Sequence, residues 1–482
     1  MGTDMGTDMD TDMRYRVTAI AIAAGVLAGC TMGPNYVRPT VAVPQAFRAP
    51  EPLPAPQAAS LADLKWFEVF KDEKLQELIH AALEQNYDLR DAVARVDEAR
   101  ANLGIVHSNQ LPQVTAGGNL DLTRLSRDGQ TPLPATFLPS QNRNWGQATV
   151  NLLSFEVDLW GRLRRATEAA RASLLNAEEN RKAVVTTLVS DVAGNYFSLL
   201  QYDYELEISQ ATLQSRRDSL RLVQERQGGG VATLLDLRQA EELVYSAAQT
   251  IPTLQQQDEQ TENQISLLLG KNPDAVVRGR KFMEQEMPPE VPAGMPSSLL
   301  ERRPDIRAAE QALIAANANI GVAKAAYFPV LSLSGFLGGQ STQLSSLFSG
   351  PHSAWSFVPQ VSQPIFTAGR LKSNVKLAEA ERDSALVQYQ KTIQTAFGDV
   401  SNALIAHQRT RESREEQERL VTALQDRKRL AYLRYRGGVD TQLNALDADR
   451  DLFQAQLTLA QIRLSELLSV VQLYKALGGG WQ

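Results

Sequence analysis

The sequence has a single cysteine, Cys30, and few histidines, so the usual ligands of a metal centre and the means to form an internal disulfide are scarce. The four histidines are far apart and lack metal-ligand spacing: His80, His107, His352 and His407. Neither a Gly-x-Ser-x-Gly nucleophile motif nor a phosphate-binding loop occurs. We therefore expect no enzyme activity, with a hydrolase as an unsupported alternative, and neither a metal nor a cofactor.

Excess basic charge and long apolar runs are missing too. A net charge of −6 gives no footprint for nucleic acid. No stretch of about 20 apolar residues occurs, so no transmembrane helix is expected. Aromatic residues make up only 6% of a chain that is 43% hydrophobic. This profile is typical of long helices with narrow apolar seams rather than of a thick globular core.

The N-terminal region predicts export. Arg14 and Arg16 precede an apolar run over 17–28, and Leu27-Ala28-Gly29-Cys30 closes it with small residues. This pattern predicts a signal peptide over 1–29, with Met13 as an alternative start because 1–12 only repeats Met-Gly-Thr-Asp. It is similar to a bacterial lipobox, which implies cleavage before Cys30 and a covalent lipid, such as palmitate, on that residue. Thr31 follows the cysteine, where Asp would resemble an inner-membrane retention signal, so the outer membrane is favoured. The alternative is a buried free cysteine.

The chain is internally repeated. The first set of matches recurs 217 positions later: Asp88, Arg90, Asn102, Gly104 and Pro112 match Asp305, Arg307, Asn319, Gly321 and Pro329. A second set recurs 208 positions later: Gly161-Arg162-Leu163, Gly229-Gly230-Val231 and Leu269-Gly270 match Gly369-Arg370-Leu371, Gly437-Gly438-Val439 and Leu477-Gly478. Repeats of this length predict two equivalent structural units packed side by side.

Each copy holds an alternating segment that predicts a β-hairpin, over about 113–157 and about 330–366. Val114, Ala116, Leu120 and Leu122 alternate with polar residues, the pattern of a strand with one apolar face. The return strand changes phase at Leu152-Leu153, which predicts a bulge. Strands of about ten residues fit the wall of a transmembrane barrel, and a soluble hairpin is the alternative.

Gly161 and Gly369 each open a proline-free run that reaches Gly228 or Gly437. A helix of about 66 residues is about 100 Å long. Apolar residues recur at strict sevens in the first run, at Val185, Val192, Leu199, Leu206, Leu213 and Leu220, which predicts a coiled-coil seam. In the second run His407 and Arg414 break that phase. Glycine clusters then reverse each run into a second helix.

Four strands cannot close a barrel, and an open edge in hydrocarbon leaves backbone groups unpaired at several kcal/mol each. We therefore expect oligomerisation to a wall of eight, twelve or sixteen strands. Such a wall joined to long amphipathic helices is a conduit.

Several motifs carry a resemblance to a known family. They are Gly33-Pro34-Asn35-Tyr36-Val37-Arg38-Pro39, Leu111-Pro112-Gln113, Phe155-Glu156-Val157-Asp158-Leu159-Trp160-Gly161, the segment 300–307 (Leu-Glu-Arg-Arg-Pro-Asp-Ile-Arg) and Pro364-Ile365-Phe366. With these the chain resembles the outer membrane factors of tripartite efflux systems, the NodT-type efflux lipoproteins related to TolC. The resemblance implies a homotrimer with a 12-stranded barrel and an α-helical periplasmic tunnel. It also implies a periplasmic membrane fusion adaptor and an inner-membrane efflux pump of the RND type as partners.

The expected fold is thus mainly α with a transmembrane β-barrel portion, in two tandem repeats, each a hairpin plus long coiled-coil helices. The expected segments are a signal peptide (1–29), a lipidated Pro-rich arm (30–60), a first repeat (61–271), a linker (272–297), a second repeat (298–478) and a tail (479–482).

Site residues follow from the resemblance. Residues near the glycine turns look like a periplasmic aperture that closes the tunnel at rest: Asp236, Tyr435, Asp447 and Arg450. The turns themselves look like the tip that docks the adaptor: Arg226, Gly229, Gly230, Val231, Arg434, Gly437, Gly438, Val439 and Asp440. The alternative for the glycines is chain reversal alone, and for Asp440 a helix cap.

The resulting expectation is an outer membrane channel subunit, lipid-anchored and spanning, that passively conducts drugs or other small molecules delivered by the adaptor and pump. The alternatives are a duct for type I protein secretion or metal efflux, or a structural envelope lipoprotein without a channel. The sequence leaves the exported compounds and the cognate adaptor open.

Overall fold

The computed structural model describes residues 31–50, 60–126, 141–286 and 294–481. Cys30, the predicted signal peptide, the loop 127–140 and the linker segment 287–293 lie outside the described residues. The chain forms two compact units. We call the first the sheet unit (31–39, Asp97–Asn176 and Glu310–Gln388) and the second the hairpin unit (Thr40–Val96, Ala177–Ala309 and Tyr389–Gln482). Each unit combines segments of both predicted repeats, so the repeats are not separate globules.

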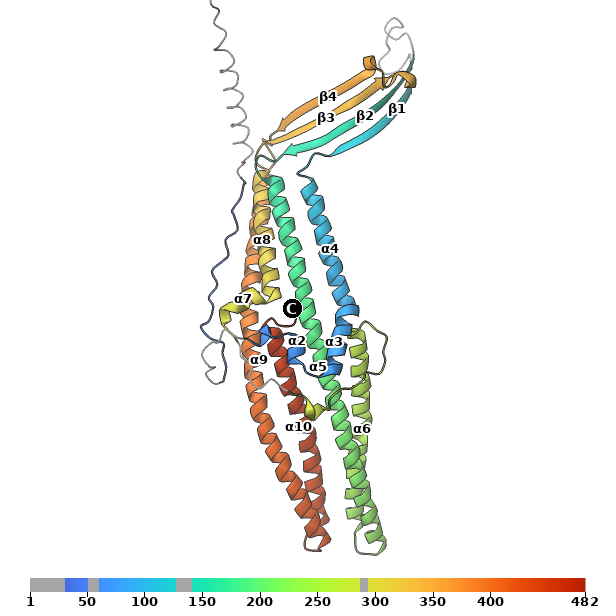
Figure 1. Ribbon diagram of the computed structural model, residues 1–482. Helices are drawn as coiled ribbons and strands as arrows, with labels where there is room; N and C mark the ends of the chain where they lie inside the picture. Colours follow the sequence, from blue (N-terminus) through green and yellow to red (C-terminus); the bar gives the residue numbers. More distant parts are fainter. Residues whose placement is uncertain (1–30, 51–59, 127–140, 287–293, 482) are drawn as a thin grey trace, which may run out of the picture. The chain divides into compact units, whose positions relative to one another are not determined.

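The longer helices of the two halves match in order and length, whereas α3 of the first half has no counterpart in the second (Figure 1). The helices of the first half are α2 (Trp66–Val69), α3 (Glu73–Gln85), α4 (Tyr87–Ser108), α5 (Arg162–Gly228) and α6 (Leu234–Leu268). Those of the second half are α7 (Leu299–Arg302), α8 (Pro304–Ala325), α9 (Arg370–Arg436) and α10 (Gln442–Ala476). The α4 and α8 helices have 22 residues each, α5 and α9 have 67, and α6 and α10 have 35. Short 3-10 turns, η1 to η5, span Leu61–Asp63, Phe282–Glu284, Pro296–Ser298, Leu344–Ser346 and Gly350–His352.

The strands of the sheet unit are β1 (Val114–Arg124), β2 (Asn142–Val157), β3 (Val330–Ser341) and β4 (Ser353–Ser362). They form one antiparallel sheet in the order β1-β2-β3-β4 (Figure 1). The register pairs Val114 with Leu152 and Leu331 with Val361. The β2–β3 register shifts between Leu152 and Phe155, which confirms the predicted bulge. Among the described residues β1 and β4 are edge strands, so each has one side without a partner.

This sheet has one apolar and one polar face. Because paired residues of an antiparallel sheet point to the same face, the register fixes which side chains share it. The apolar face is open: Val114 is 64%, Leu337 66% and Trp355 74% exposed. On the opposite face Asn119, Gln147 and Gln340 lie in one row across three strands, and the Gln340 amide donates to Gln147 Oε1 at 3.0 Å. Trp145, paired with Asp121, lies on this polar face and not on the apolar one.

The long helices bury the middle of the predicted seam, whereas Val185, Leu206 and Leu220 are partly exposed. Val192 and Leu199 on α5 are fully buried, as are Ile393 and Val400 on α9. Where His407 and Arg414 interrupt the apolar phase, the seam continues with polar pairs. His407 Nδ1 lies 3.0 Å from Ser469 Oγ, and Arg414 Nε lies 2.9 Å from the buried Glu466 carboxylate. Burial lowers the pKa of His407, which favours the neutral ring.

The segment before α4 is more broken than the sequence suggested. The sequence pattern predicts a regular helix that begins between about Leu61 and Glu73 and runs to about Asn109, but helix caps divide this segment. The Ser60 hydroxyl and the Asp63 carboxylate form a capping box around η1. The Asp72 carboxylate accepts from two backbone amides at the start of α3, and Asn86 Oδ1 accepts from Leu89 N at the start of α4. These side chains satisfy amides that would otherwise be unpaired, and so favour new helix starts.

The arm that follows Cys30 is held in the sheet unit. Arg165 of α5 is buried; its Nε donates to Met32 O at 3.1 Å and its Nη2 to Asn35 Oδ1 at 2.7 Å. Gly33 has a φ of +87°, and a Cβ there would lie 2.5 Å from the Cα of Gly321. Only glycine at both positions permits this close approach of the arm to α8.

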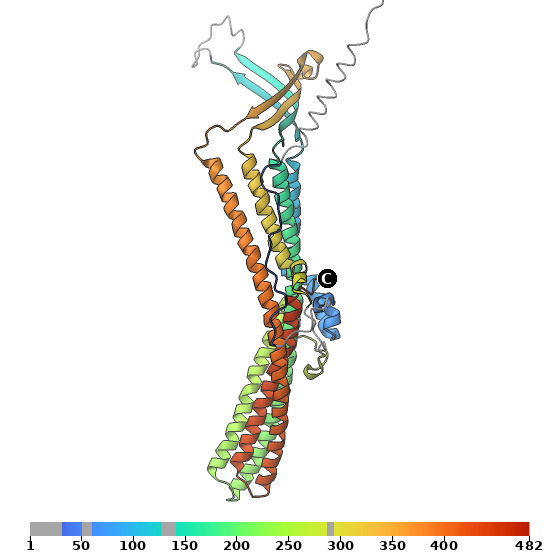
Figure 2. The ribbon, with the colours of Figure 1, turned by 90° about the vertical axis from the view of Figure 1, so that its left-hand side faces the viewer.

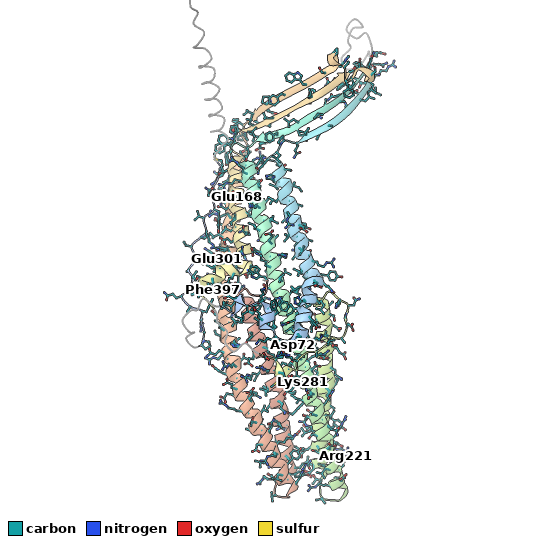
Figure 3. All side chains as sticks on the ribbon, viewed as in Figure 1. Asp72, Glu168, Arg221, Lys281, Glu301 and Phe397 are labelled. Carbon is teal, nitrogen blue, oxygen red and sulfur yellow. The ribbon has the colours of Figure 1, made fainter. Side chains whose placement is uncertain are left out.

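In the hairpin unit Asp72, labelled in Figure 3, joins three parts of the chain. Besides capping α3, its carboxylate accepts from Tyr196 Oη at 3.1 Å, Arg280 N at 2.9 Å and Gln285 Nε2 at 2.8 Å. It is only 3% exposed. Burial raises the pKa of Tyr196, which therefore stays a donor. The carboxylate thus fastens residues 280–285 to α3 and α5.

One helix of the described residues, α5, is long and apolar enough over one stretch to cross a membrane by length and composition, and 56% of that stretch is buried inside the structure. A buried core helix passes the same test, so this is weak evidence for a spanning helix.

We predict that Asp72→Ala lowers the free energy of unfolding by about 3 kcal/mol, because it removes a cap and leaves buried donors unpaired. Thermal unfolding of the detergent-solubilised protein, followed by helical circular dichroism, measures this. Glu77→Ala is the matched control on α3, since Glu77 only pairs with exposed Lys74 and should change stability by less than about 1 kcal/mol. Equal effects of the two substitutions would contradict the role of Asp72.

Candidate functional site

The predicted aperture and docking residues lie in the hairpin unit, at or near the two turns that join α5 to α6 and α9 to α10. The two hairpins lie side by side in both views (Figures 1 and 2). In the first turn Val231 N donates to Arg226 O at 2.9 Å and Gly230 N to Gln227 O at 3.0 Å. This is the Schellman pattern of helix termination, which needs a left-handed residue. Gly230 supplies it with a φ of +75°.

The second turn has the same construction. Val439 N donates to Arg434 O at 3.1 Å, Gly438 N donates to Tyr435 O at 3.1 Å, and Gly438 has a φ of +73°. The apolar residue after the left-handed glycine often packs back on its helix in such motifs. Here both are open to solvent: Val231 is 70% and Val439 67% exposed. Leu234 and Leu235, at the start of α6, are also exposed.

Two of the predicted carboxylates are used locally. Asp236 forms a capping box with Thr233: its Oδ2 accepts from Thr233 N at 2.7 Å, and Thr233 Oγ1 accepts from Asp236 N at 3.1 Å. These hydrogen bonds lower the pKa of Asp236. Asp440 accepts from Arg434 Nε at 2.9 Å and from Thr441 N at 2.8 Å, whereas the N-cap of α10 is the next residue, Thr441.

Tyr435 joins all four helices at the turns. Its ring lies 5.0 Å from the Arg226 guanidinium of α5, a cation–π contact. Its hydroxyl lies 3.3 Å from Gln442 Oε1 of α10, and the Gln442 amide donates to Asp236 O of α6 at 3.3 Å. Tyr435 is 9% exposed. Within one chain this residue is therefore a packing centre rather than a free surface group.

Asp447 and Arg450 form an ion pair one helical turn apart on α10. The Arg450 guanidinium lies 3.1 Å from Asp447 Oδ1, with Asp447 32% and Arg450 61% exposed.

A buried ion cluster that sequence reasoning missed is centred on Asp449, which lies between these two residues in the sequence of α10. Asp449 of α10 is 1% exposed; it pairs with Arg216 of α5 at 2.7 Å and with Lys428 of α9 at 2.5 Å. Arg216 also donates to Leu243 O of α6 at 2.9 Å and packs on the Phe453 ring. We call Arg216, Lys428 and Asp449 the interhelix triad. The signal that the sequence offered for this cluster is a charged residue close to the apolar seam, because Arg216 follows Leu213 of the seam by three residues.

A cleft of about 510 Å³ lies between α5, α9 and α10, beside the triad. Its lining includes Leu222, Val223, Tyr432, Tyr435 and Leu446. Within the described chain no group of three or more His, Cys, Asp or Glu side chains is placed to hold a metal ion.

The comparisons with known proteins identify the family. The model of the outer membrane efflux protein family matches residues 78–271 and 295–479. The chain belongs to the outer membrane efflux protein family. Relatives match over nearly the whole chain. The probable efflux pump outer membrane protein TtgC of Pseudomonas putida is 38% identical over 469 residues, which cover 96% of this chain and 95% of that protein. The cation efflux system protein CusC of Escherichia coli is 35% identical over 459 residues, 95% of this chain and 97% of that protein.

Solved structures of similar proteins support the same family assignment. The open state of the Neisseria gonorrhoeae MtrE outer membrane channel superposes with a TM-score of 0.85 at 33% identity, covering 94% of this chain and 99% of that one. The outer membrane channel OprN gives 0.84 at 30% identity, covering 94% and 100%. The chain is therefore an outer membrane efflux channel protein with a long periplasmic extension, of a family that is not an enzyme family and whose members work with adaptor and pump partners.

We predict that Asp449→Ala lowers the free energy of unfolding by about 3–5 kcal/mol, because buried Arg216 would keep its charge without a counter-ion and partly buried Lys428 would lose its partner. The matched control is Asp451→Ala, two residues along α10, whose carboxylate pairs with exposed Arg427 at 2.8 Å and should contribute less than about 1 kcal/mol. Thermal unfolding in detergent compares the two. A loss for Asp449→Ala no greater than for the control would show that the triad does not stabilise the hairpins.

Proposed function

We propose that three copies of this chain form one efflux channel, with a 12-stranded barrel in the outer membrane and a periplasmic tunnel of hairpin helices. The observation that carries the proposal is the sheet with two open edges, an apolar face and a polar face. Unpaired edges do not persist in hydrocarbon, so a membrane sheet of this kind must be closed by strands from other copies. The polar row of Asn119, Gln147 and Gln340 then faces a water-filled lumen.

Lipidation of Cys30 adds an anchor at the arm. The support is the contact of residues 32–35 with Arg165, which fixes the chain shortly after the cysteine to the unit that carries the sheet. A lipid attached there inserts beside the barrel wall, and the covalent lipid is the only non-protein group that we propose.

The aperture that closes the tunnel at rest is formed by α10 and its neighbours. The exposed Asp447–Arg450 pair has charge available for contacts between copies, because neither side chain is buried within one chain. Tyr435 and Asp236 act through the turn: the first packs the four helices together and the second caps α6. An exposed ion pair stabilises a contact by only about 0.2–1 kcal/mol. Three such contacts, one from each copy, therefore form a weak latch that adaptor binding can release.

The two turns form the tip that docks the periplasmic adaptor. Val231 and Val439 are exposed apolar groups at equivalent places, and Arg226, Arg434 and Asp440 surround them with charge. Glycines 229, 230, 437 and 438 keep both turns narrow, and the adjacent cleft lined by Leu222 and Tyr432 offers a second apolar surface.

The cargo that we propose is a drug or another small molecule, delivered by an inner-membrane pump of the RND type. TtgC is named as an efflux pump protein, whereas CusC is named for cation efflux, so metal efflux is the second candidate. In cells lacking the protein, loss of resistance to organic compounds without loss of metal tolerance supports the first, and the reverse supports the second.

Resting conductance tests the channel and its latch. Purified protein in planar bilayers should give discrete conductance steps, and Asp447→Ala should raise the resting conductance severalfold because three latch pairs are lost. Asp426→Ala is the matched control, since Asp426 forms an i,i+3 pair with Arg429 of the same kind on α9. Absence of any steps contradicts the channel, and equal conductance of all three proteins contradicts the latch.

Adaptor docking tests the tip. Val231→Asp combined with Val439→Asp should reduce cross-linking to the adaptor in intact cells by about tenfold or more, because two apolar contacts at the proposed interface are replaced by charge. Val277→Asp serves as control, since Val277 is similarly exposed at 66% but lies outside the turns. Unchanged cross-linking of the double variant, with normal levels in the outer membrane, would rule out this tip as the docking surface.

A further inference from the structure

The pairing of β2 with β3 shows how a strand of the first half meets a strand of the second half. If three copies close a ring, β4 must meet β1 of a second copy in the equivalent way. Resting on the proposed trimer, we propose that β4 and the three residues that follow it pair antiparallel with β1 of the next copy in one register, in which Val361 faces Gly118 and Ile365, just beyond β4, faces Val114.

The equivalences come from the two hairpins. Pro112 and Pro329 each lie two residues before an equivalent residue of the two hairpins, Val114 in the first and Leu331 in the second. Val114 pairs with Leu152, and Leu331 pairs with Val361. Val361 of β4 therefore takes the place of Leu152 of β2. At the other end, Val157 and Ile365 each lie four residues before a glycine with left-handed φ, Gly161 at +75° and Gly369 at +83°.

The β2–β3 register can now be transferred to the open edges. In β2–β3, Leu152 pairs with Gly335 and Val157 pairs with Leu331. Gly335 lies six residues after Pro329, as Gly118 does after Pro112. The first pair therefore becomes Val361 with Gly118 of the second copy. The second becomes Ile365 with Val114 of the second copy.

The transferred register removes the bulge. From Leu152 to Val157 there are five steps on β2 against four from Gly335 to Leu331 on β3, and the extra residue makes the bulge. From Val361 to Ile365 there are four steps, matched by the four from Gly118 to Val114. The seam between copies therefore has no bulge, although the seam inside each chain is bulged. Pro359 of β4, which would face Leu120 of the second copy, has no N–H and leaves one hydrogen bond of this ladder unmade.

Both faces of the sheet agree with this register. It places Phe357 opposite Leu122, two exposed residues of the apolar face (59% and 67%). It places Gln360 opposite Asn119 on the polar face. A slip of one residue would set apolar side chains of one copy beside polar side chains of the other, so the two-faced pattern selects the register.

The residues next to the strand ends show how the β2–β3 seam inside the chain differs from the β4–β1 seam between copies. Inside the chain, Trp160 stacks on Phe328 at 4.7 Å, and its Nε1 donates to Pro329 O at 2.8 Å. The equivalent residues at the open edges are Ala368 and Leu111-Pro112. No indole is available there, so the strand ladder, with Ile365 (90% exposed) and Leu111 (56%) beside it, must hold the copies together.

Disulfide trapping in the outer membrane of intact cells tests the register. Gln360→Cys with Asn119→Cys, and Phe357→Cys with Leu122→Cys, are the in-register pairs. They lie three residues apart and so are of opposite hydrogen-bonding type, which ensures that one has the short Cα separation of about 4.5 Å. Within one chain β1 and β4 are separated by three strand spacings, about 14 Å, which is beyond disulfide reach. Any bond therefore joins different copies.

The controls are Gln360→Cys with Thr115→Cys and Gln360→Cys with Thr123→Cys, on the same face but four residues out of register in either direction, about 13 Å. Each single substitution serves as a further control. We expect covalent dimers and trimers on denaturing gels with at least one in-register pair. The controls should give at least tenfold less covalently linked protein. Bonds in an out-of-register pair, or none in any pair of a variant that still gives conductance steps, would overturn the register and leave the channel standing. If the variants and the parent protein alike fail to assemble or conduct, both the register and the proposed channel are lost.

Discussion

The constraint on which the structure depends is that backbone N–H and C=O groups at a sheet edge cannot stay unpaired in a membrane. One chain provides four strands with an open edge at β1 and another at β4. The apolar face of the sheet, with Val114, Leu337 and Trp355 open, prevents the alternative of exposing it to water over its whole area. Closure by further copies satisfies both requirements at once, and the doubled chain supplies equivalent edges for it.

The hairpin unit solves a different problem, since its helices pack along narrow seams and not around a thick core. Apolar contacts at Val192 and Val400 are supplemented by buried polar groups, of which the interhelix triad joins one hairpin to the other. Buried ion pairs of this kind give specificity of pairing more than net stability. By contrast, the ion pairs nearest the turns, such as Arg434–Asp440, involve exposed side chains and contribute little to stability, which suits the docking tip that we propose.

Much of this could be predicted from local patterns. Alternation located the strands, a phase slip located the bulge at Leu152, and glycine clusters located the turns at Gly230 and Gly438. The breaks before α4 were not predicted, because the caps at Ser60 and Asp72 override an otherwise helical composition. The triad was out of reach because Arg216 and Asp449 are 233 residues apart in the chain. Tyr435 was predicted as a site residue, but its packing against Arg226 and Gln442 needed the structure. Asp236 was likewise predicted, yet its carboxylate is occupied by the cap of α6.

Native mass spectrometry of the mature protein, released from detergent micelles, measures the number of copies directly. The account predicts a species of three chains, each of somewhat less than the 53.0 kDa of the full sequence, that stays intact until the detergent is stripped and the assembly is strongly activated. A single chain that remains folded in detergent-free buffer would contradict it, because the four-stranded sheet would then persist with its edges and its apolar face uncovered.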